Sequence, residues 1–290
     1  MARVRRVTVS GHRSFEYISQ GEGPATLLVH PGGPGWTYHY LRGLPRLANA
    51  NLRVVLFNPR GVGHSWAPKR ASEYSIANMA DDVEAIRRAL KITELHLLGH
   101  STGGFVALEY AHRYETPITS LLLCATAGAP EEIHAAYRLM IGCASPHQRH
   151  RLRDLAKAKA FDSAEYKLLS EQVYQPFQTR FVKETSKDWK ATRFSQTVYR
   201  AMLTRSGDDF ACDGTIADWD GRKYYSKIEV PTVVVVGRYD YFLGPSVEMA
   251  DRIEPAHLRV LARSSHMAIL EQPKEFLGTI REFLSDVTGG

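Results

Sequence analysis

The sequence has few cysteines, and their spacing matches no known framework. Only 3 of its 290 residues are cysteine, at positions 124, 143 and 212, and no two of them form a C-x-x-C pair. An odd number of widely separated cysteines is typical of reduced thiols and predicts neither a disulfide-stabilised secreted fold nor a zinc site. We therefore expect a cytoplasmic protein without a bound metal ion.

Long apolar runs are also lacking. Behind Met1 the chain continues with the largely basic residues 2–6, and no extended apolar stretch follows them. A secretory signal needs such a stretch, and a membrane-spanning helix needs a longer one. The sequence therefore predicts neither a signal peptide nor a membrane partner.

Basic residues are only slightly more numerous than acidic residues. The chain has 37 Lys and Arg against 31 Asp and Glu, a formal net charge of +6, without a long block of basic residues. No basic stripe interleaved with aromatic residues is present, so we do not expect nucleic-acid binding. The 44% hydrophobic content is instead typical of a globular protein with a sizeable core.

Apolar segments with two different periods alternate along the chain. Short continuous runs indicate strands buried on both faces of a sheet, and spacings of three to four residues indicate helices packed on it. After an initial hairpin signal, this alternation predicts a parallel sheet with right-handed crossovers. The expected strands are residues 7–9, 15–18, 25–30, 53–57, 95–98, 118–124, 233–237 and 257–261, and the expected helices are residues 38–48, 76–90, 104–114, 245–253 and 273–286.

The alternation is interrupted once. From about residue 128 to residue 227 the apolar spacing is mostly helical, and the segment is rich in charged and aromatic residues. The sequence therefore predicts three parts: a first core segment (residues 1–127), an inserted helical lid (residues 128–227) and a second core segment (residues 228–290).

A G-x-S-x-G pentapeptide, residues 99–103, follows one of the expected strands. In a nucleophile elbow, side chains at the two glycine positions would collide, and the serine is held in a strained conformation with its oxygen exposed. A helical pattern follows the pentapeptide, as such an elbow requires. Ser101 is therefore the candidate nucleophile.

Two further residues could activate this serine. A serine hydroxyl needs an imidazole to take its proton and a carboxylate to orient that ring. Asp240 follows the expected strand 233–237, and His266 lies in the loop after the next strand. The chain order Ser, Asp, His and the location after strand ends predict that the three converge. Asp218 and Asp220 are alternative acids, less favoured because they precede the strand.

Acyl transfer also places negative charge on the carbonyl oxygen, which needs two aimed donors. The N–H of Thr102, directly after the candidate nucleophile, is one of them. The Pro-Gly-Gly-Pro-Gly turn at residues 31–35 follows a buried strand and offers the N–H of Gly33 as the other, with Gly32 as an alternative.

With these motifs the chain resembles an α/β-hydrolase, and among hydrolases it is most similar to the proline iminopeptidases. The resemblance spans nearly the whole chain and includes the Gly-Gly-Pro-Gly turn at residues 32–35, the segment 60–65, the Ser101 elbow and Gly-Arg-Tyr-Asp at residues 237–240. It implies an α/β-hydrolase fold, with a mostly parallel sheet flanked by helices and an inserted helical lid.

Members of that group remove an N-terminal residue, often proline, and acidic lid side chains hold the substrate's ammonium group. Asp209 is the corresponding candidate here, and a solvated charge at a helix end is its alternative interpretation. The chain departs from the group at Thr102, where tryptophan is usual, and at Asn58, where aspartate is usual. Tyr241 follows Asp240 at a place where a further acid would help to hold an amine, so an ester, lactone or other amide is an alternative substrate.

The sequence thus predicts a cofactor-independent serine hydrolase that acts through an acyl-enzyme on a small-molecule or short peptide substrate. Proline-iminopeptidase-like cleavage is favoured, an esterase or lactonase comes second, and a non-catalytic binding protein with this fold comes third. Haloalkane dehalogenases and epoxide hydrolases are less favoured because they carry aspartate at the elbow. No oligomeric state is predicted. The candidate residues are Ser101, Asp240 and His266 for catalysis, Gly33 and Thr102 for the oxyanion hole, and Trp36, His100, Asp209 and Tyr241 for substrate binding.

Overall fold

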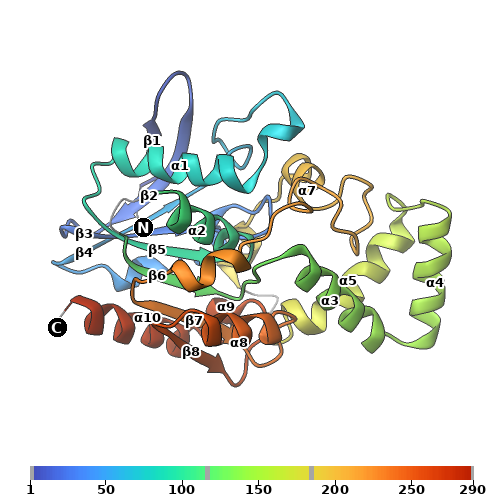
Figure 1. Ribbon diagram of the computed structural model, residues 1–290. Coiled ribbons are helices and arrows are strands. Elements are labelled where there is room, and N and C mark those ends of the chain that lie inside the picture. Colours follow the sequence, from blue (N-terminus) through green and yellow to red (C-terminus); the bar gives the residue numbers. More distant parts are fainter. Residues whose placement is uncertain (1–2, 115–117, 183–185, 289–290) are drawn as a thin grey trace.

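A single sheet covered by helices on both faces forms the centre of the molecule (Figure 1). The computed structural model describes residues 3–114, 118–182 and 186–288. The sheet has the strand order β1-β2-β4-β3-β5-β6-β7-β8. The strands are β1 (Arg5–Thr8), β2 (Ser14–Gln20), β3 (Ala25–His30), β4 (Leu52–Phe57), β5 (Glu94–His100), β6 (Ile118–Cys124), β7 (Thr232–Gly237) and β8 (Ala256–Leu261).

The direction of the strands agrees with the sequence pattern. β1, β2 and β4 pair antiparallel, so the chain begins with the predicted hairpin. From β4 to β8 every pairing is parallel. Each residue of β3 and β7 is buried, which explains their continuous apolar runs. Parallel order brings the carboxyl ends of these strands to one edge of the sheet.

Two apolar clusters cover the two faces of the sheet. Alternate strand residues divide between them, so that Leu28 belongs to one cluster and its neighbours Leu27 and Val29 to the other. The first cluster includes residues of α1 (Ile76–Ala89), α2 (Thr102–Arg113) and α8 (Leu243–Arg252), and the second includes residues of the 3-10 helices near the N-terminus, of α9 (Ala268–Glu271) and of α10 (Pro273–Thr288).

One expected helix is wrong. The single helix predicted for residues 38–48 is two short 3-10 helices, η1 (Tyr38–Leu41) and η2 (Leu44–Leu47). Gly43 lies between them, and Pro45 occupies the first turn of η2. Proline has no N–H to donate to the preceding turn, so η1 cannot continue through residue 45 and a new helix begins there. A third 3-10 helix, η3 (Ala71–Glu73), precedes α1.

A helical insertion, residues 128–227, connects β6 to β7 and lies beyond the carboxyl ends of the strands (Figure 1). Serine side chains at positions 145, 163, 186 and 195 cap the N-termini of its helices α4 to α7. The helices of the insertion are α3 (Pro130–Cys143), α4 (Pro146–Lys157), α5 (Ala164–Gln178), α6 (Lys187–Ala191), α7 (Gln196–Met202) and the 3-10 helix η4 (Arg222–Lys227).

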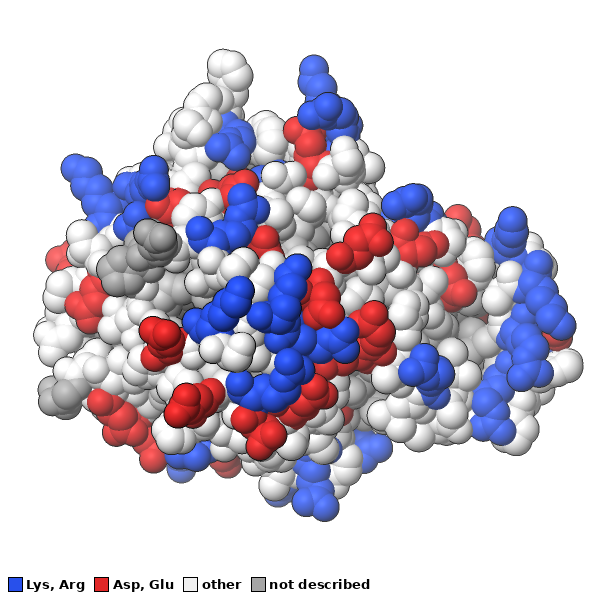
Figure 2. Space-filling model, in the orientation of Figure 1, with Lys and Arg blue, Asp and Glu red and all other residues white. Residues whose placement is uncertain are grey.

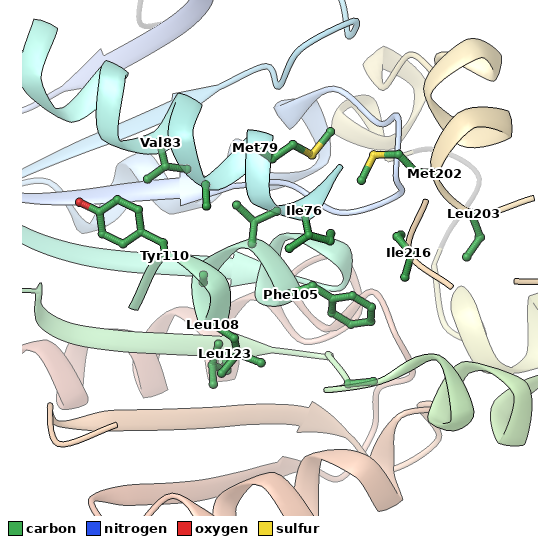
Figure 3. Packing of buried hydrophobic residues seen from close by; sticks show 14 of the residues in the cluster. Ile76, Met79, Val83, Phe105, Leu108, Tyr110, Leu123, Met202, Leu203 and Ile216 are labelled. Atoms are coloured by element: carbon green, nitrogen blue, oxygen red, sulfur yellow. The ribbon is translucent and has the colours of Figure 1, made fainter. Parts of the chain in front are cut away.

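The helical insertion shares its core with the sheet. Met202, Leu203 and Ile216 of the insertion belong to the same apolar cluster as Phe105 of α2 and Ile76 of α1. Figure 3 shows these side chains meeting at the end of α2. Burial of this kind stabilises a contact by about 25 cal/mol per Å² of apolar area, so the insertion is fastened to the sheet by packing.

Charged residues of both signs alternate over the face seen in Figure 2, and basic residues gather at the edge where α4 lies. Among those of α4 and the following turn, Arg153, Lys157 and Lys159 are exposed. No helix within the described ranges combines the length and the apolarity needed to cross a bilayer.

Candidate active site

The elbow joins β5 to α2 at Ser101. Ser101 has φ 54° and ψ −124°, in the left-handed region that is strained for a residue with a side chain. Its N–H donates to the carbonyl oxygen of Cys124 over 2.9 Å, and its carbonyl oxygen accepts from the Thr126 hydroxyl over 2.8 Å. Bonds from the neighbouring strand end thus hold the strained residue in place.

Neither glycine of the pentapeptide, Gly99 or Gly103, has room for a side chain. A Cβ atom on Gly99 would lie 2.2 Å from the carbonyl oxygen of Gly103. A Cβ atom on Gly103 would lie 2.3 Å from the carbonyl oxygen of His30, at the end of β3. Both contacts are with backbone atoms, which cannot turn aside as a side chain would. The collisions expected of an elbow are therefore present at both positions.

Asp240 and His266 are hydrogen-bonded to each other. The His266 Nδ1 atom lies 3.1 Å from Oδ1 and 3.2 Å from Oδ2 of Asp240, and both residues are almost fully buried. The N–H of Phe242 also donates to Asp240 Oδ1, over 2.8 Å. Because an ionised carboxylate only accepts, this arrangement places the proton of a neutral imidazole on Nδ1 and leaves Nε2 as the basic nitrogen.

Tyr241 links this pair to Ser101. Its ring stacks on the His266 ring, with centroids 4.4 Å apart and planes inclined by 24°. Its hydroxyl interacts with the side chain of Ser101. Burial raises the pKa of Tyr241 well above its usual value, so the phenol stays protonated and can donate a hydrogen bond. The structure, which describes Ser101 and His266 in full, gives no direct hydrogen bond between the two side chains.

The two candidate oxyanion donors border the same space. Thr102 is the first residue of α2, where helical N–H groups have no partner within the helix. Gly33 and Thr102 both line the cavity described below. The alternative donor, Gly32, has its N–H bound to the Tyr40 hydroxyl over 2.7 Å. Gly33 therefore remains the better candidate from this turn.

A cavity of about 570 Å³ lies between the helical insertion and the carboxyl ends of the strands. Its volume falls within the roughly 300–1,000 Å³ typical of small-molecule sites. Aromatic side chains of the insertion make up much of its wall. The cavity brings together six of the predicted site residues, namely Gly33, Trp36, Ser101, Thr102, Asp209 and Tyr241.

Asp209 is held in the wall of this cavity by tyrosines. The Tyr199 hydroxyl donates to its carboxylate over 3.2 Å, and the Tyr174 hydroxyl donates to its carbonyl oxygen over 2.6 Å. The Asp209 N–H donates to the Tyr166 hydroxyl over 2.8 Å. Burial raises the pKa of the Asp209 carboxyl above its usual value. This environment differs from that of a solvated charge at a helix end.

Other candidates lie elsewhere. His100 is buried, with its Nδ1 bound to Tyr40 and its Nε2 bound to the His266 carbonyl oxygen, and it is not part of the cavity wall. It therefore lies behind the site and does not face a substrate. Of the alternative acids, Asp218 is exposed and Asp220 pairs with Arg222 over 2.7 Å, and neither borders the cavity.

Several cavity residues were not singled out from the sequence. Tyr137, Tyr174 and Tyr199 carry no local signal beyond their aromatic character, because their positions depend on how α3, α5 and α7 pack. Glu171 also borders the cavity and adds a second carboxylate. Within the described parts of the chain, no group of three or more histidine, cysteine, aspartate or glutamate residues could hold a metal ion.

Comparisons with known proteins agree with this architecture. The family model for the alpha/beta hydrolase fold matches residues 25–273. A proline iminopeptidase of Saccharolobus solfataricus is 28% identical over 274 residues, covering 93% of this chain and 88% of that protein. One of Heyndrickxia coagulans is 25% identical over 290 residues, covering 97% of this chain and 98% of that protein.

A solved structure is similar over almost the entire length. The crystal structure of the proline iminopeptidase of Mycobacterium smegmatis has a TM-score of 0.86, with 24% sequence identity and 98% of each chain covered. At that identity the likeness concerns the fold. The family match, which spans most of the chain, is more decisive. This chain is therefore a member of the α/β-hydrolase family, a hydrolase similar to the proline iminopeptidases.

Proposed function

We propose that this hydrolase acts through an acyl-enzyme, with Ser101 as the nucleophile. Ser101 attacks the substrate carbonyl while His266 takes its proton and then passes it to the leaving group. Asp240 orients the imidazole and stabilises its charged form. The N–H groups of Gly33 and Thr102 bind the oxyanion. Water then repeats the attack on the acyl-enzyme and releases the product.

This proposal is supported by one cavity that Ser101, Gly33 and Thr102 all border, together with Tyr241. Ser101 projects from a strained elbow at its floor, and the Asp240–His266 pair lies directly behind Tyr241 in its wall. A catalytic hydrogen bond between nucleophile and base is often long or poorly aligned until substrate is bound. We therefore expect the Ser101 hydroxyl to turn from Tyr241 to His266 Nε2 when the cavity is occupied.

For the substrate, we propose an amino-acyl or short peptide compound with a free amine, as in proline-iminopeptidase-like cleavage. The helical insertion, residues 128–227, would serve as the lid that supplies this specificity. Support comes from Asp209, a carboxylate in a mostly aromatic wall, because an ammonium group leaving water needs an opposite charge nearby. The tyrosines that fix its backbone would keep the carboxylate aimed.

Replacing Asp209 by asparagine is expected to lower kcat/KM for prolyl p-nitroanilide by roughly 100-fold, about 3 kcal/mol, because a buried charge loses its partner. The measurement uses a second substrate, cyclopentanecarbonyl p-nitroanilide, in which a CH₂ group replaces the amine. Its turnover should stay unchanged. Asp218→Asn is the matched control, since Asp218 is an exposed aspartate of the helical insertion that does not border the cavity. Equal losses on both substrates would contradict the role given to Asp209.

The same carboxylate predicts a dependence on pH. Burial raises the pKa of Asp209, so protonation neutralises it at a higher pH than an exposed aspartate. As pH falls through that pKa, KM for the prolyl substrate should rise, whereas KM for the carbocyclic substrate should not. Steady-state kinetics on both substrates across the acidic range measure this difference, and parallel KM profiles would speak against it.

Ester or lactone hydrolysis is the second candidate, favoured by the apolar cavity wall and the neutral Tyr241 hydroxyl beside Ser101. Prolyl p-nitroanilide and p-nitrophenyl acyl esters, assayed side by side, separate the two. Turnover of esters alone would remove the aminopeptidase assignment. We also propose a cytoplasmic location, because Cys124, Cys143 and Cys212 are unpaired and Cys143 is exposed.

A further inference from the structure

Three loops of the site are joined by a chain of hydrogen bonds that the mechanism above does not use. The N–H of Gly32, in the turn after β3, donates to the Tyr40 hydroxyl over 2.7 Å. That hydroxyl lies 2.9 Å from Nδ1 of His100, at the end of β5. His100 Nε2 lies 3.1 Å from the carbonyl oxygen of His266, in the loop after β8.

The donors and acceptors of this hydrogen-bond network can be paired in only one way. The His266 carbonyl oxygen only accepts, so His100 Nε2 must carry a proton and donate it. A neutral His100 then has an unprotonated Nδ1, which accepts from Tyr40. The Tyr40 oxygen is left to accept from the Gly32 N–H. Every donor in the chain has an acceptor, and reversing any bond would leave one unpaired.

The two side chains of this hydrogen-bond network are buried. Tyr40 is 0% and His100 is 3% exposed. Burial, and next the nearby His266, lower the pKa of His100 to about 3, so its ring stays neutral at physiological pH. The rings of His100 and His266 are 5.0 Å apart. A neutral His100 therefore does not oppose the positive charge that His266 acquires during catalysis.

We propose that Tyr40 and His100 are positioning residues. They hold the turn at residues 31–35, which carries the proposed oxyanion donor Gly33, at a fixed distance from the proposed catalytic residue His266. Gly32 directly precedes the proposed donor Gly33. Anchoring the Gly32 N–H therefore also fixes the direction of the Gly33 N–H. The turn also packs on the elbow, because a Cβ atom on Gly32 would lie 2.7 Å from Cβ of Ser101. Misplacement of catalytic groups by about 1 Å can cost roughly 100-fold in rate.

This inference rests on the proposed acyl-enzyme mechanism, and its first test is Tyr40→Phe. The variant keeps the buried ring but removes the hydroxyl that joins Gly32 to His100. We expect kcat to fall by roughly 10- to 100-fold while KM changes by less than about threefold, because the donors lose aim and the cavity wall stays intact. Steady-state kinetics with the substrate that the wild type hydrolyses fastest, measured well below the melting temperature, give kcat and KM.

A matched control uses another buried tyrosine. The Tyr225 hydroxyl is buried without a hydrogen-bond partner among the described residues, and Tyr225 does not border the cavity. Tyr225→Phe therefore removes a buried hydroxyl without touching the site and should leave kcat unchanged. A loss of melting temperature shared by both variants, without a change in kcat for Tyr40→Phe, would reduce Tyr40 to a structural residue.

The second test asks whether the two residues act as one unit. His100→Gln keeps a donor for the His266 carbonyl oxygen but loses the fixed geometry of the ring. If Tyr40 and His100 position the same groups, the double variant should lose no more than about the larger single loss. Losses that multiply would overturn the proposal. If Tyr40→Phe matches wild type while Ser101→Ala is inactive, only this inference fails; turnover by Ser101→Ala would instead remove the mechanism on which it rests.

Discussion

Replacing Ser101 by alanine is expected to lower kcat by roughly 10⁵-fold or more, because the proposed acyl-enzyme forms on the oxygen atom that this change removes. Alanine removes a single oxygen atom and leaves the strained elbow, its hydrogen bonds to Cys124 and Thr126, and the cavity in place. Substrate binding should therefore survive. Turnover of prolyl p-nitroanilide and of acyl esters, together with substrate binding by calorimetry, measures the two effects separately.

The control for this variant is Ser285→Ala, which removes the hydroxyl of an exposed serine on α10. Its kcat should equal that of the wild type. Full turnover by Ser101→Ala on every substrate that the wild type hydrolyses would show that the nucleophile lies elsewhere. A folded Ser101→Ala protein that no longer binds substrate would point to a binding role for the hydroxyl.

Asp240→Asn is expected to cost roughly 10⁴-fold in kcat, by analogy with the same change in enzymes that have an established Ser-His-Asp triad. The oxygen of the introduced amide can still accept from the Phe242 N–H, so its NH₂ group would face His266 Nδ1. That ring nitrogen would then have to accept, which moves the imidazole proton to Nε2 and removes the base that we propose for Ser101. The ring itself should remain in place, because Tyr241 still stacks on it.

Asp251→Asn provides the matched control, since Asp251 is an exposed aspartate on α8. It removes one negative charge and should leave kcat unchanged. Melting temperatures distinguish loss of catalysis from loss of fold. A well-folded Asp240→Asn enzyme with near wild-type kcat would mean that the His266 tautomer does not matter, and that Asp240 is structural.

The elbow could be predicted from sequence because its causes are local. Gly99 and Gly103 are required by contacts within a few residues or with the adjoining strand, and the apolar run before them marks the strand. Asp240 and His266 followed from chain order, since parallel strands present their following loops on one edge. In the structure these two side chains are hydrogen-bonded to each other.

Other features depend on packing between distant segments. The segment 38–48 has an apolar pattern that fits one helix, and only the break near Gly43 and Pro45 gives two 3-10 turns. The Tyr40 hydroxyl of η1 is hydrogen-bonded to His100, a contact between residues 60 positions apart in the sequence. The tyrosines around Asp209 come from α5 and α7. No periodicity in the sequence encodes such contacts.

Ser101 as the nucleophile is tested most directly by covalent labelling of the wild-type protein with a fluorophosphonate, followed by intact mass measurement and peptide mapping. An activated serine in this site should take up one phosphonyl group per chain, at Ser101, and Ser101→Ala should take up none. Labelling should also slow strongly in Asp240→Asn, where the proposed base is lost. A folded wild-type protein that stays unmodified, or that is modified at another serine, would contradict the assignment of Ser101 as the nucleophile.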